Sequence, residues 1–306
     1  MLPPLDPTIA ETLAALPDLT LTPETLPTIR GLLGGAAVEV RDGVERVERV
    51  VDESSGVRVV VHRPSTAGQD RPGIIYLHGG GYVLGNSTMD VTRLDQWCAH
   101  LDCVAVSAEY RLAPEHPYPT PLEDCYAALR WSLEHADDLG IDPQRIGIAG
   151  LSAGGGLAAA LALLARDRGE HPVAFQLLDS PMLDDRQVTP SSQAEGLAVW
   201  TKDANTFGWR SYLGERYGTD DVPYYAAPAR AENLTGLPPT FVMVGGVDGF
   251  RDEDVDYALR LSQAGVPAEL HVYPGAPHGF GLFPDLHAAS QAARDVEDWL
   301  ARQFAS

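Results

Sequence analysis

The sequence predicts an α/β fold in which helices wrap an open, mostly parallel β-sheet. Five short, continuous apolar runs are typical of parallel strands that are buried on both faces of a sheet. These runs alternate along the chain with segments of helical periodicity, as expected for this fold class. The apolar runs are residues 73–77, 104–108, 145–149, 175–178 and 240–244, and the helical segments are residues 90–101, 122–139, 153–168, 252–264 and 286–304.

Three further strands bring the predicted sheet to eight. Residues 45–51 and 56–62 alternate apolar and polar side chains, which is typical of paired antiparallel strands at the edge of a sheet. Residues 269–273 supply one more strand, late in the chain. We therefore expect a mostly parallel eight-stranded sheet with helices on its faces.

Two segments outside this pattern predict a helical cap. Residues 1–44 contain two amphipathic segments, near 8–16 and 23–33, that are interrupted by prolines. The main domain then spans 45–306, with an insertion at about 184–223 that is longer than usual connections in such folds. The insertion is either a packed surface subdomain or part of a cap with the N-terminal helices, and these interpretations are compatible. Its aromatic residues are Trp200, Phe207, Trp209 and Tyr212.

The composition excludes several classes of partner. The 306 residues carry a formal net charge of −21, which should repel nucleic acid phosphates and anionic membranes. Three cysteines without framework spacing indicate reduced thiols, so we expect a cytoplasmic protein. The N-terminus has no basic region followed by a long apolar core, which argues against a secretory signal peptide. No apolar stretch approaches the roughly 18 residues of a membrane span.

The segment around Ser152 predicts a catalytic nucleophile. An apolar strand runs into Gly150 and a helix opens at Ala153, so Ser152 lies on a sharp strand-to-helix turn. Gly150 and Gly154 flank it in a G-x-S-x-G pattern, and glycine is needed because a Cβ would clash where backbone segments pass closely. The turn projects the hydroxyl above the sheet and leaves the Ala153 amide unpaired for a developing oxyanion. A chance match is the alternative, and the flanking strand and helix argue against it.

A second glycine cluster, His-Gly-Gly-Gly at 78–81, follows another apolar strand. Successive glycines at a strand end leave backbone amides open to a negative oxygen. A flexible turn or a phosphate loop is the alternative, but a phosphate loop would be followed by a Lys–Ser/Thr pair, whereas Tyr82 follows here. We interpret His78 as a residue that orders the loop, because His278 is the better candidate base.

His278 and Asp248 lie on the loops after two late strands, from where both side chains can reach the serine. The chain order Ser152, Asp248, His278 is the order found in hydrolases with this kind of nucleophile turn. His278 would remove the proton from Ser152 and return a proton to the leaving alcohol, while Asp248 fixes the imidazole tautomer and stabilises its charged form.

We interpret the other acidic residues near Asp248, and the other histidines, as structural and not as catalytic or metal-binding residues. The acidic run 252–254 is the rival to Asp248, and we interpret it as a solvated helix start, where acidic residues favour the helix dipole. Histidines 62, 100, 116, 135, 171, 271 and 287 are scattered and do not pair at metal-ligand spacing. We therefore predict no metal and no other cofactor.

With these residues assembled, the chain resembles the bacterial hormone-sensitive-lipase-like esterases, often called family IV, of the α/β-hydrolase superfamily. The resemblance covers about residues 45–304. It is carried by five motifs in order: the His-Gly-Gly-Gly at 78–81, Tyr-Arg-Leu-Ala-Pro-Glu at 110–115, Gly-Leu-Ser-Ala-Gly-Gly at 150–155, Asp248 with Arg-Asp-Glu at 251–253, and His-Gly-Phe at 278–280.

The resemblance implies an α/β-hydrolase catalytic domain at 45–306 with a helical cap. It implies hydrolysis of short-to-medium acyl carboxylic esters through an acyl-enzyme, by a monomer or homodimer. It also implies that Gly80 and Gly81 join the Ala153 amide in an oxyanion hole, and that residues 110–115 are scaffold. An ion pair between Arg111 and Glu115 would lock that scaffold loop. The candidate pocket residues, each equally well explained as core, are Tyr82, Phe207 and Trp209.

Two positions depart from the family's pattern. Leu151 stands before the nucleophile, where the family usually has an acidic residue, so we expect altered pH behaviour or rate. Gly249-Phe250 follows Asp248 in place of the usual Pro-Leu, which predicts a less rigid loop. Two other function classes are alternatives to an esterase. A non-catalytic small-molecule receptor would be expected to lack triad residues, all of which are present here, whereas an amide or peptide hydrolase would use the same triad.

Overall fold

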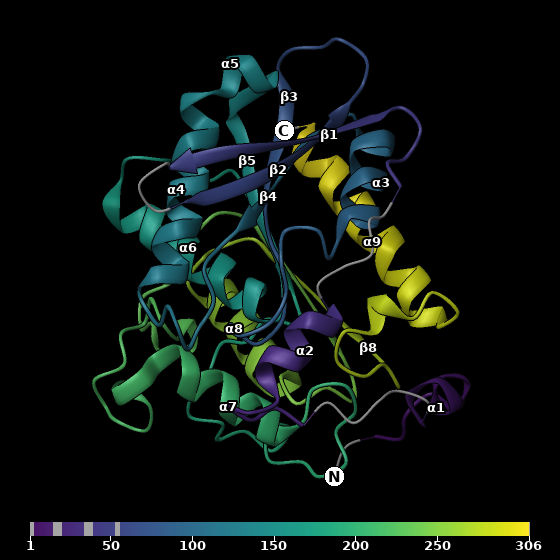
Figure 1. Cartoon of the computed structure of the whole chain (residues 1–306), viewed down its shortest axis with the longest axis vertical. Helices are drawn as coiled ribbons and strands as arrows, with labels where there is room; N and C mark the ends of the chain where they lie inside the picture. Colours follow the sequence, from purple (N-terminus) through teal and green to yellow (C-terminus); the bar gives the residue numbers. More distant parts are fainter. Residues whose placement is uncertain (1–2, 15–19, 34–38, 53–55, 306) are drawn as a thin grey trace.

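The computed structural model describes residues 3–14, 20–33, 39–52 and 56–305 (Figure 1). Within them, one eight-stranded sheet has the order β1-β2-β4-β3-β5-β6-β7-β8. β2 pairs antiparallel with β1 and β4, and the other neighbours are parallel. The strands are β1 (Val44–Asp52), β2 (Val57–Pro64), β3 (Arg71–Leu77), β4 (Val104–Glu109), β5 (Ile141–Leu151), β6 (Gln176–Asp179), β7 (Thr240–Gly245) and β8 (Ala268–Tyr273). All eight predicted strands are thus confirmed.

Helices cover both faces of the sheet. α3 and α9 lie on one face, and α4, α6 and α8 pack on the other (Figure 1). The predicted helix 122–139 is divided at His135, whose backbone leaves the helical region, into α4 and the short α5. The helices are α1 (Pro7–Ala14), α2 (Leu26–Leu33), α3 (Val91–Leu101), α4 (Thr120–Glu134), α5 (Ala136–Leu139), α6 (Ala153–Arg168), α7 (Lys202–Leu213), α8 (Arg251–Gln263) and α9 (His287–Phe304).

The apolar runs are continuous because both faces of the central strands are covered. Every residue of β3 and of β6 is buried, including Ile74 and Ile75, whose side chains enter the two separate core clusters. One cluster lies under α3 and α9, and the other lies under α4, α6 and α8. The alternating pattern of β2, by contrast, matches a strand that is less completely covered.

The segments outside the sheet pattern meet at one end of the molecule. In Figure 1, α2 and α7 lie near one another at the lower end. Leu26 and Ile29 of α2 share a core cluster with Trp209 and Tyr212 of α7. Arg30 of α2 is hydrogen-bonded to the carbonyl oxygens of Val83 and Ala113 at 2.8 and 2.7 Å. The N-terminal segment is therefore tied to the loops at the carboxyl ends of β3 and β4.

Three findings bear on the kind of protein. No helix in the described part of the chain is long and apolar enough to cross a membrane. In those same residues, no cluster of three or more His, Cys, Asp or Glu side chains could hold a metal ion. The three cysteines are buried and free.

Candidate active site

The turn between β5 and α6 holds Ser152 in a conformation that few side chains adopt. Its φ is 57° and its ψ is −119°, outside the helical and extended regions. A Cβ on Gly150 would lie 2.1 Å from the carbonyl oxygen of Gly154, and a Cβ on Gly154 would lie 2.0 Å from that of Leu77. The predicted need for both glycines is confirmed, and the strained turn is held by close packing of α6 against β3.

The structure brings the three predicted triad side chains together. His278 Nε2 lies 3.0 Å from Ser152 Oγ, and His278 Nδ1 lies 2.8 Å from Asp248 Oδ2. All three residues are buried. In this geometry an Nδ1–H donates to Asp248, which leaves Nε2 free to accept the serine proton.

The electrostatics favour a protonatable imidazole. Burial lowers the pKa of His278, but the charge of Asp248 and its hydrogen bond raise it, so the net pKa lies above the ordinary value. The Phe250 ring packs edge-on against the imidazole, with ring centroids 5.1 Å apart. This contact and the Asp248 hydrogen bond fix the orientation of the ring.

The loop after β3 presents free amides next to the serine. The amides of Gly80, Gly81 and Ala153 have no hydrogen-bond acceptor among the described residues. Gly80 and Gly81 have φ values of 117° and 60°, in the region that favours glycine. These three donors match the composition of an oxyanion hole.

His78 orders this loop, as predicted. Its Nδ1 is 2.8 Å from the carbonyl oxygen of Gly79, and its ring stacks on Tyr110 with centroids 4.1 Å apart. The Tyr110 hydroxyl donates to the His78 carbonyl oxygen at 2.7 Å. Burial lowers the pKa of His78, which keeps the ring neutral.

Comparisons with known proteins show the family to which the chain belongs. A family model described as the α/β-hydrolase fold matches residues 74–282. The chain is 36% identical to esterase LipI of Mycobacterium tuberculosis, over 95% of this chain and 92% of that protein. It is 35% identical to carboxylesterase NlhH of the same organism, over 88% of this chain and 81% of that one.

Solved structures extend the likeness to the whole chain. A bacterial heroin esterase superposes with a TM-score of 0.92 at 40% identity, covering 99% of this chain and 98% of that one. Esterase LipW from Mycobacterium marinum gives a TM-score of 0.88 at 37% identity, covering 98% and 96%. The chain belongs to the hormone-sensitive-lipase-like esterases of the α/β-hydrolase fold. It is a carboxylic-ester hydrolase of the serine type.

The predicted ion pair within the 110–115 loop of this esterase is wrong. Arg111 pairs with Asp124 of α4 at 2.7 Å, and Glu115 pairs with Arg30 of α2 at 2.7 Å. Both partners come from other elements, so the loop is locked from outside. The scaffold role of the loop stays, with different contacts.

The interpretation of residues 252–254 as a solvated helix start is also wrong for two of the three. Glu253 and Asp254 are buried, and Glu253 Oε1 accepts hydrogen bonds from the Leu183 and Asp184 amides at 2.8 and 3.1 Å. Burial raises the pKa of both carboxyls well above the ordinary range. Asp252 is partly exposed and pairs with Arg251. The first turn of α8 therefore faces the core.

At the two positions that depart from the family pattern, hydrogen bonds hold the loop after Asp248, and the Leu151 side chain makes packing contacts. The Phe250 amide donates to Asp248 Oδ1 at 2.9 Å, and the Ser191 hydroxyl donates to the Gly249 carbonyl oxygen at 2.9 Å. These bonds hold the loop that glycine was expected to loosen. The Leu151 side chain packs against Gly79, at the start of the glycine loop.

The structure separates the three candidate pocket residues. Trp209 and Tyr82 are 0% and 1% exposed, and Tyr82 stacks on Tyr212 with centroids 4.0 Å apart. Because neither side chain reaches open space, the pocket interpretation does not suit them, and both pack the core beneath the insertion. Phe207 is partly buried and stays a candidate.

Sequence reasoning missed Trp200 as a site residue. A Cβ on Gly81 would lie 2.2 Å from the edge of the Trp200 indole, so the ring covers Gly81. Its centroid lies 6.5 Å from that of His278. In the sequence, Trp200 is distinguished only as one aromatic residue of the insertion, because no local pattern marks the point at which an insertion crosses a distant loop.

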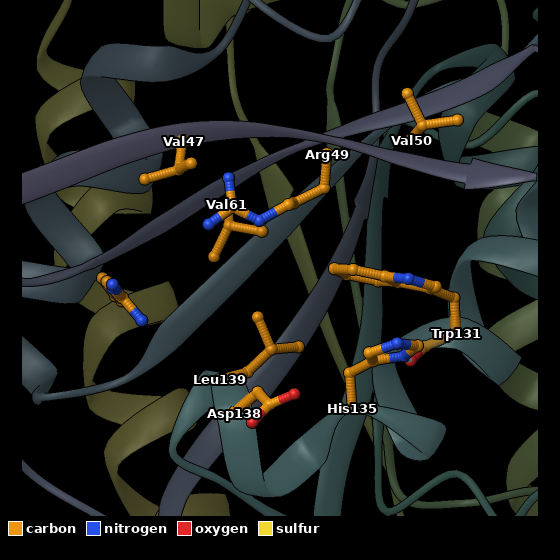
Figure 2. A pocket seen from close by; sticks show the side chains of 9 residues that line it. Val47, Arg49, Val50, Val61, Trp131, His135, Asp138 and Leu139 are labelled. Atoms are coloured by element: carbon orange, nitrogen blue, oxygen red, sulfur yellow. Dashed lines mark hydrogen bonds between the residues drawn. The ribbon is translucent and has the colours of Figure 1, made fainter.

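A hollow of about 410 Å³ lies elsewhere, between β1, β2 and the α4–α5 corner (Figure 2). Its walls include Trp131 and His135, whose rings stack with centroids 4.8 Å apart, together with Arg49 and Asp138. It contains none of the triad or glycine-loop residues. This hollow is therefore separate from the candidate active site.

Proposed function

We propose that this esterase hydrolyses short-to-medium acyl esters with Ser152 as nucleophile, His278 as general base and acid, and Asp248 as the group that orients the imidazole. The observation that carries this assignment is the unbroken chain from Ser152 Oγ to His278 at 3.0 Å and on to Asp248 at 2.8 Å. The pKa of His278, raised above its ordinary value, suits a group that must hold a proton in mid-reaction.

The first half-reaction forms the acyl-enzyme. Ser152 Oγ attacks the ester carbonyl carbon while its proton moves to His278 Nε2. The carbonyl oxygen becomes an oxyanion, which accepts hydrogen bonds from the Gly80, Gly81 and Ala153 amides. When the tetrahedral intermediate collapses, the bond to the alcohol oxygen breaks, and His278 gives its proton to the leaving alcohol.

The second half-reaction returns the enzyme. Water gives a proton to His278 Nε2 as its oxygen attacks the acyl carbon, and the same amides stabilise the second oxyanion. Collapse releases the carboxylic acid, and the proton on His278 returns to Ser152 Oγ. Asp248 stays ionised throughout and stabilises each transient imidazolium.

We infer that α2 and the insertion at 184–223 form a cap over this site. Trp200 covers Gly81, and Arg30 ties α2 to the loop that follows the glycines. A cap that places an indole over the oxyanion donors limits the room for the acyl or alcohol group, which supports small esters as substrates. We further propose that the protein acts in the cytoplasm as a monomer or homodimer.

The assignment is tested with Ser152→Ala. This change should abolish hydrolysis of p-nitrophenyl acetate and butyrate, and covalent labelling by an organophosphate, because both need the serine oxygen. The control is Ser262→Ala, at an exposed serine of α8, which should keep full activity and labelling. Hydrolysis by Ser152→Ala at the wild-type rate would refute the nucleophile. A matched anilide is assayed in parallel, and turnover equal to that of the ester would assign an amide hydrolase instead.

A further inference from the structure

A second carboxylate lies between the strands that carry the triad. β6 runs between β5 and β7, and its last residue, Asp179, is in register with Leu151 of β5 and Met243 of β7. Ser152 follows directly after β5 and Asp248 follows soon after β7. Since parallel strands end at the same edge, Asp179 occupies the place between the nucleophile and the acid.

Asp179 is bonded to the nucleophile turn through its backbone. Its carbonyl oxygen accepts the Ser152 amide at 2.8 Å. The next residue, Ser180, has a φ of 45°, and its amide donates to the Met243 carbonyl oxygen at 2.7 Å. The end of β6 is therefore fixed on both sides, and the carboxylate has a defined direction.

The side chain of Asp179 is paired with Arg93 of α3. Arg93 Nη1 lies 2.9 Å from Asp179 Oδ2, and Arg93 Nε lies 4.0 Å from Asp90 Oδ1. A Cβ on Gly281 would lie 2.8 Å from Arg93 Nη2, so the guanidinium packs against the loop that carries His278. One ion pair thus touches the nucleophile turn, α3 and the histidine loop.

The two partners differ in their access to water. The Asp179 side chain is 4% exposed, whereas that of Arg93 is 22% exposed. Arg93 and Asp90 line a cavity of about 450 Å³, which Phe280 and residues of α3 and α9 also border. The Arg93 side chain is therefore open to solvent on one side. The buried Asp179 carboxylate, by contrast, relies on the positive charge of Arg93 to offset its own negative charge.

The charges around Asp179 favour an effect on His278. Burial raises the pKa of Asp179, and the attraction and hydrogen bond of Arg93 reduce this rise without cancelling it. The Asp179 charge adds to that of Asp248 in raising the pKa of His278. The titratable groups that act on Asp179, or on which it acts, are Arg93, Asp90, Tyr76, His278, Tyr273 and Asp254.

We propose that Asp179 is a second acidic positioning residue for His278: its buried carboxylate, paired with Arg93, stabilises the imidazolium that forms in each half-reaction. This inference rests on the proposed triad. Asp248 orients the ring through a direct bond, whereas Asp179 acts through space and through the turn that it shares with Ser152. The imidazolium would thus be stabilised by two carboxylates: that of Asp248, which is hydrogen-bonded to the ring, and that of Asp179, which acts on it through space.

The test is the pH profile of kcat/KM for p-nitrophenyl butyrate in Asp179→Asn, measured from about pH 5 to about pH 9. Loss of the negative charge should lower the pKa of the acidic limb by about half a pH unit or more, and should lower the plateau about three- to tenfold. A purely structural role would lower thermal stability and leave the profile superimposable on that of the wild type, and this result would overturn the proposal.

Arg93 provides a second route that does not depend on how Asp179→Asn folds. Arg93→Gln should also lower the acidic-limb pKa, because a buried carboxyl without its cation takes up a proton. Arg93→Lys keeps the charge and should restore most of the wild-type profile. A rise of the acidic-limb pKa in Arg93→Gln, or identical profiles for the two Arg93 variants, would overturn the part given to Arg93.

The matched control is Asp95→Asn, which breaks another buried ion pair that involves α3, the helix of Arg93. Asp95 forms ion pairs with Arg46 of β1 and His62 of β2, at the other end of the sheet order from the triad strands. Its loss should lower the melting temperature without moving the acidic-limb pKa. Ser152→Ala is assayed alongside: an active Ser152→Ala would sink the triad itself, whereas an inactive one with an unchanged Asp179→Asn profile would sink the inference about Asp179 alone.

Discussion

Backbone carbonyl oxygens leave no room for a side chain at position 154. A Cβ there would lie 2.0 Å from the Leu77 carbonyl oxygen and 2.4 Å from that of His78. Both atoms belong to the end of β3 and the start of the glycine loop, so any side chain must push α6 away from the sheet. Such a shift moves Ser152 relative to the amides of Gly80 and Gly81.

We therefore expect Gly154→Ala to lower kcat/KM at least about 100-fold, because small displacements of reacting groups are costly. It should also lower the free energy of unfolding by about 1–3 kcal/mol, as overpacking does. The control is Gly31→Ala, on an exposed position of α2 with no heavy atom within 4 Å of the new methyl. That change should raise stability by about 0.5–1 kcal/mol and keep activity. Normal kinetics in Gly154→Ala would contradict the close packing described for this turn.

Single residues were predictable where a local pattern constrains the backbone. Ser152 and its flanking glycines follow from the strand–turn–helix sequence, and His278 follows from its loop and from elimination. Glu253 was not predictable, because acidic residues in a first helical turn look alike whether they face water or the core. Asp179 and Arg93 are 86 positions apart in the sequence, and no pattern in the residues around either one predicts that they pair.

At the scale of elements, a strained residue lies in the insertion at 184–223, directly before Trp200. Val199 has a φ of 67°, which is unusual for a β-branched side chain. The next residue, Trp200, donates weakly from its indole to Asn205 at 3.4 Å, and Thr201 caps α7 by accepting the Ala204 amide. Together these contacts hold the indole over Gly81, and the strain is consistent with a functional placement.

Trp200→Ala should therefore widen the site. We expect the ratio of kcat/KM for a p-nitrophenyl decanoate to that for the acetate to rise about tenfold, because a removed wall admits the longer acyl chain. Trp131→Ala removes an equal volume in the hollow of Figure 2, which no triad residue lines, and should lower stability without changing this ratio. An unchanged ratio in Trp200→Ala would remove Trp200 from the pocket.

Strands were more predictable than the connections between them. The parallel strands read as continuous apolar runs because helices cover both faces, and this signal is independent of the partner strand. The predicted ion pair of the 110–115 loop is wrong because that prediction assumes both partners lie within the loop. Its true partners lie in α4 and α2, and Glu115 is 85 positions from Arg30. Pairs between elements follow from the packed fold, so the sequence carries no local record of them.

For the molecule as a whole, the pH dependence of stability reflects buried acids in a chain of net charge −21. Asp254 is 0% exposed, and neither of its oxygens has a hydrogen-bond partner among the described residues. Burial raises its pKa well above the ordinary value. The folded state therefore keeps a proton that the unfolded chain loses near about pH 4. The contribution of the protonated Asp254 to the free energy of unfolding is therefore complete below about pH 4. It is lost as the pH rises through the pKa that Asp254 has in the folded protein.

Asp254→Asn should flatten this dependence, because the amide does not titrate. At pH 8 we expect a melting temperature at least about 2 °C above that of the wild type, and near pH 4 we expect values within about 1 °C. Asp256→Asn, at an exposed position on the same helix, removes the same formal charge and so controls for the general relief of self-repulsion. It should shift the melting temperature little at either pH. Curves of melting temperature against pH that run parallel for Asp254→Asn and the wild type would mean that Asp254 stays ionised in the fold, in which case a cation or water must reach it.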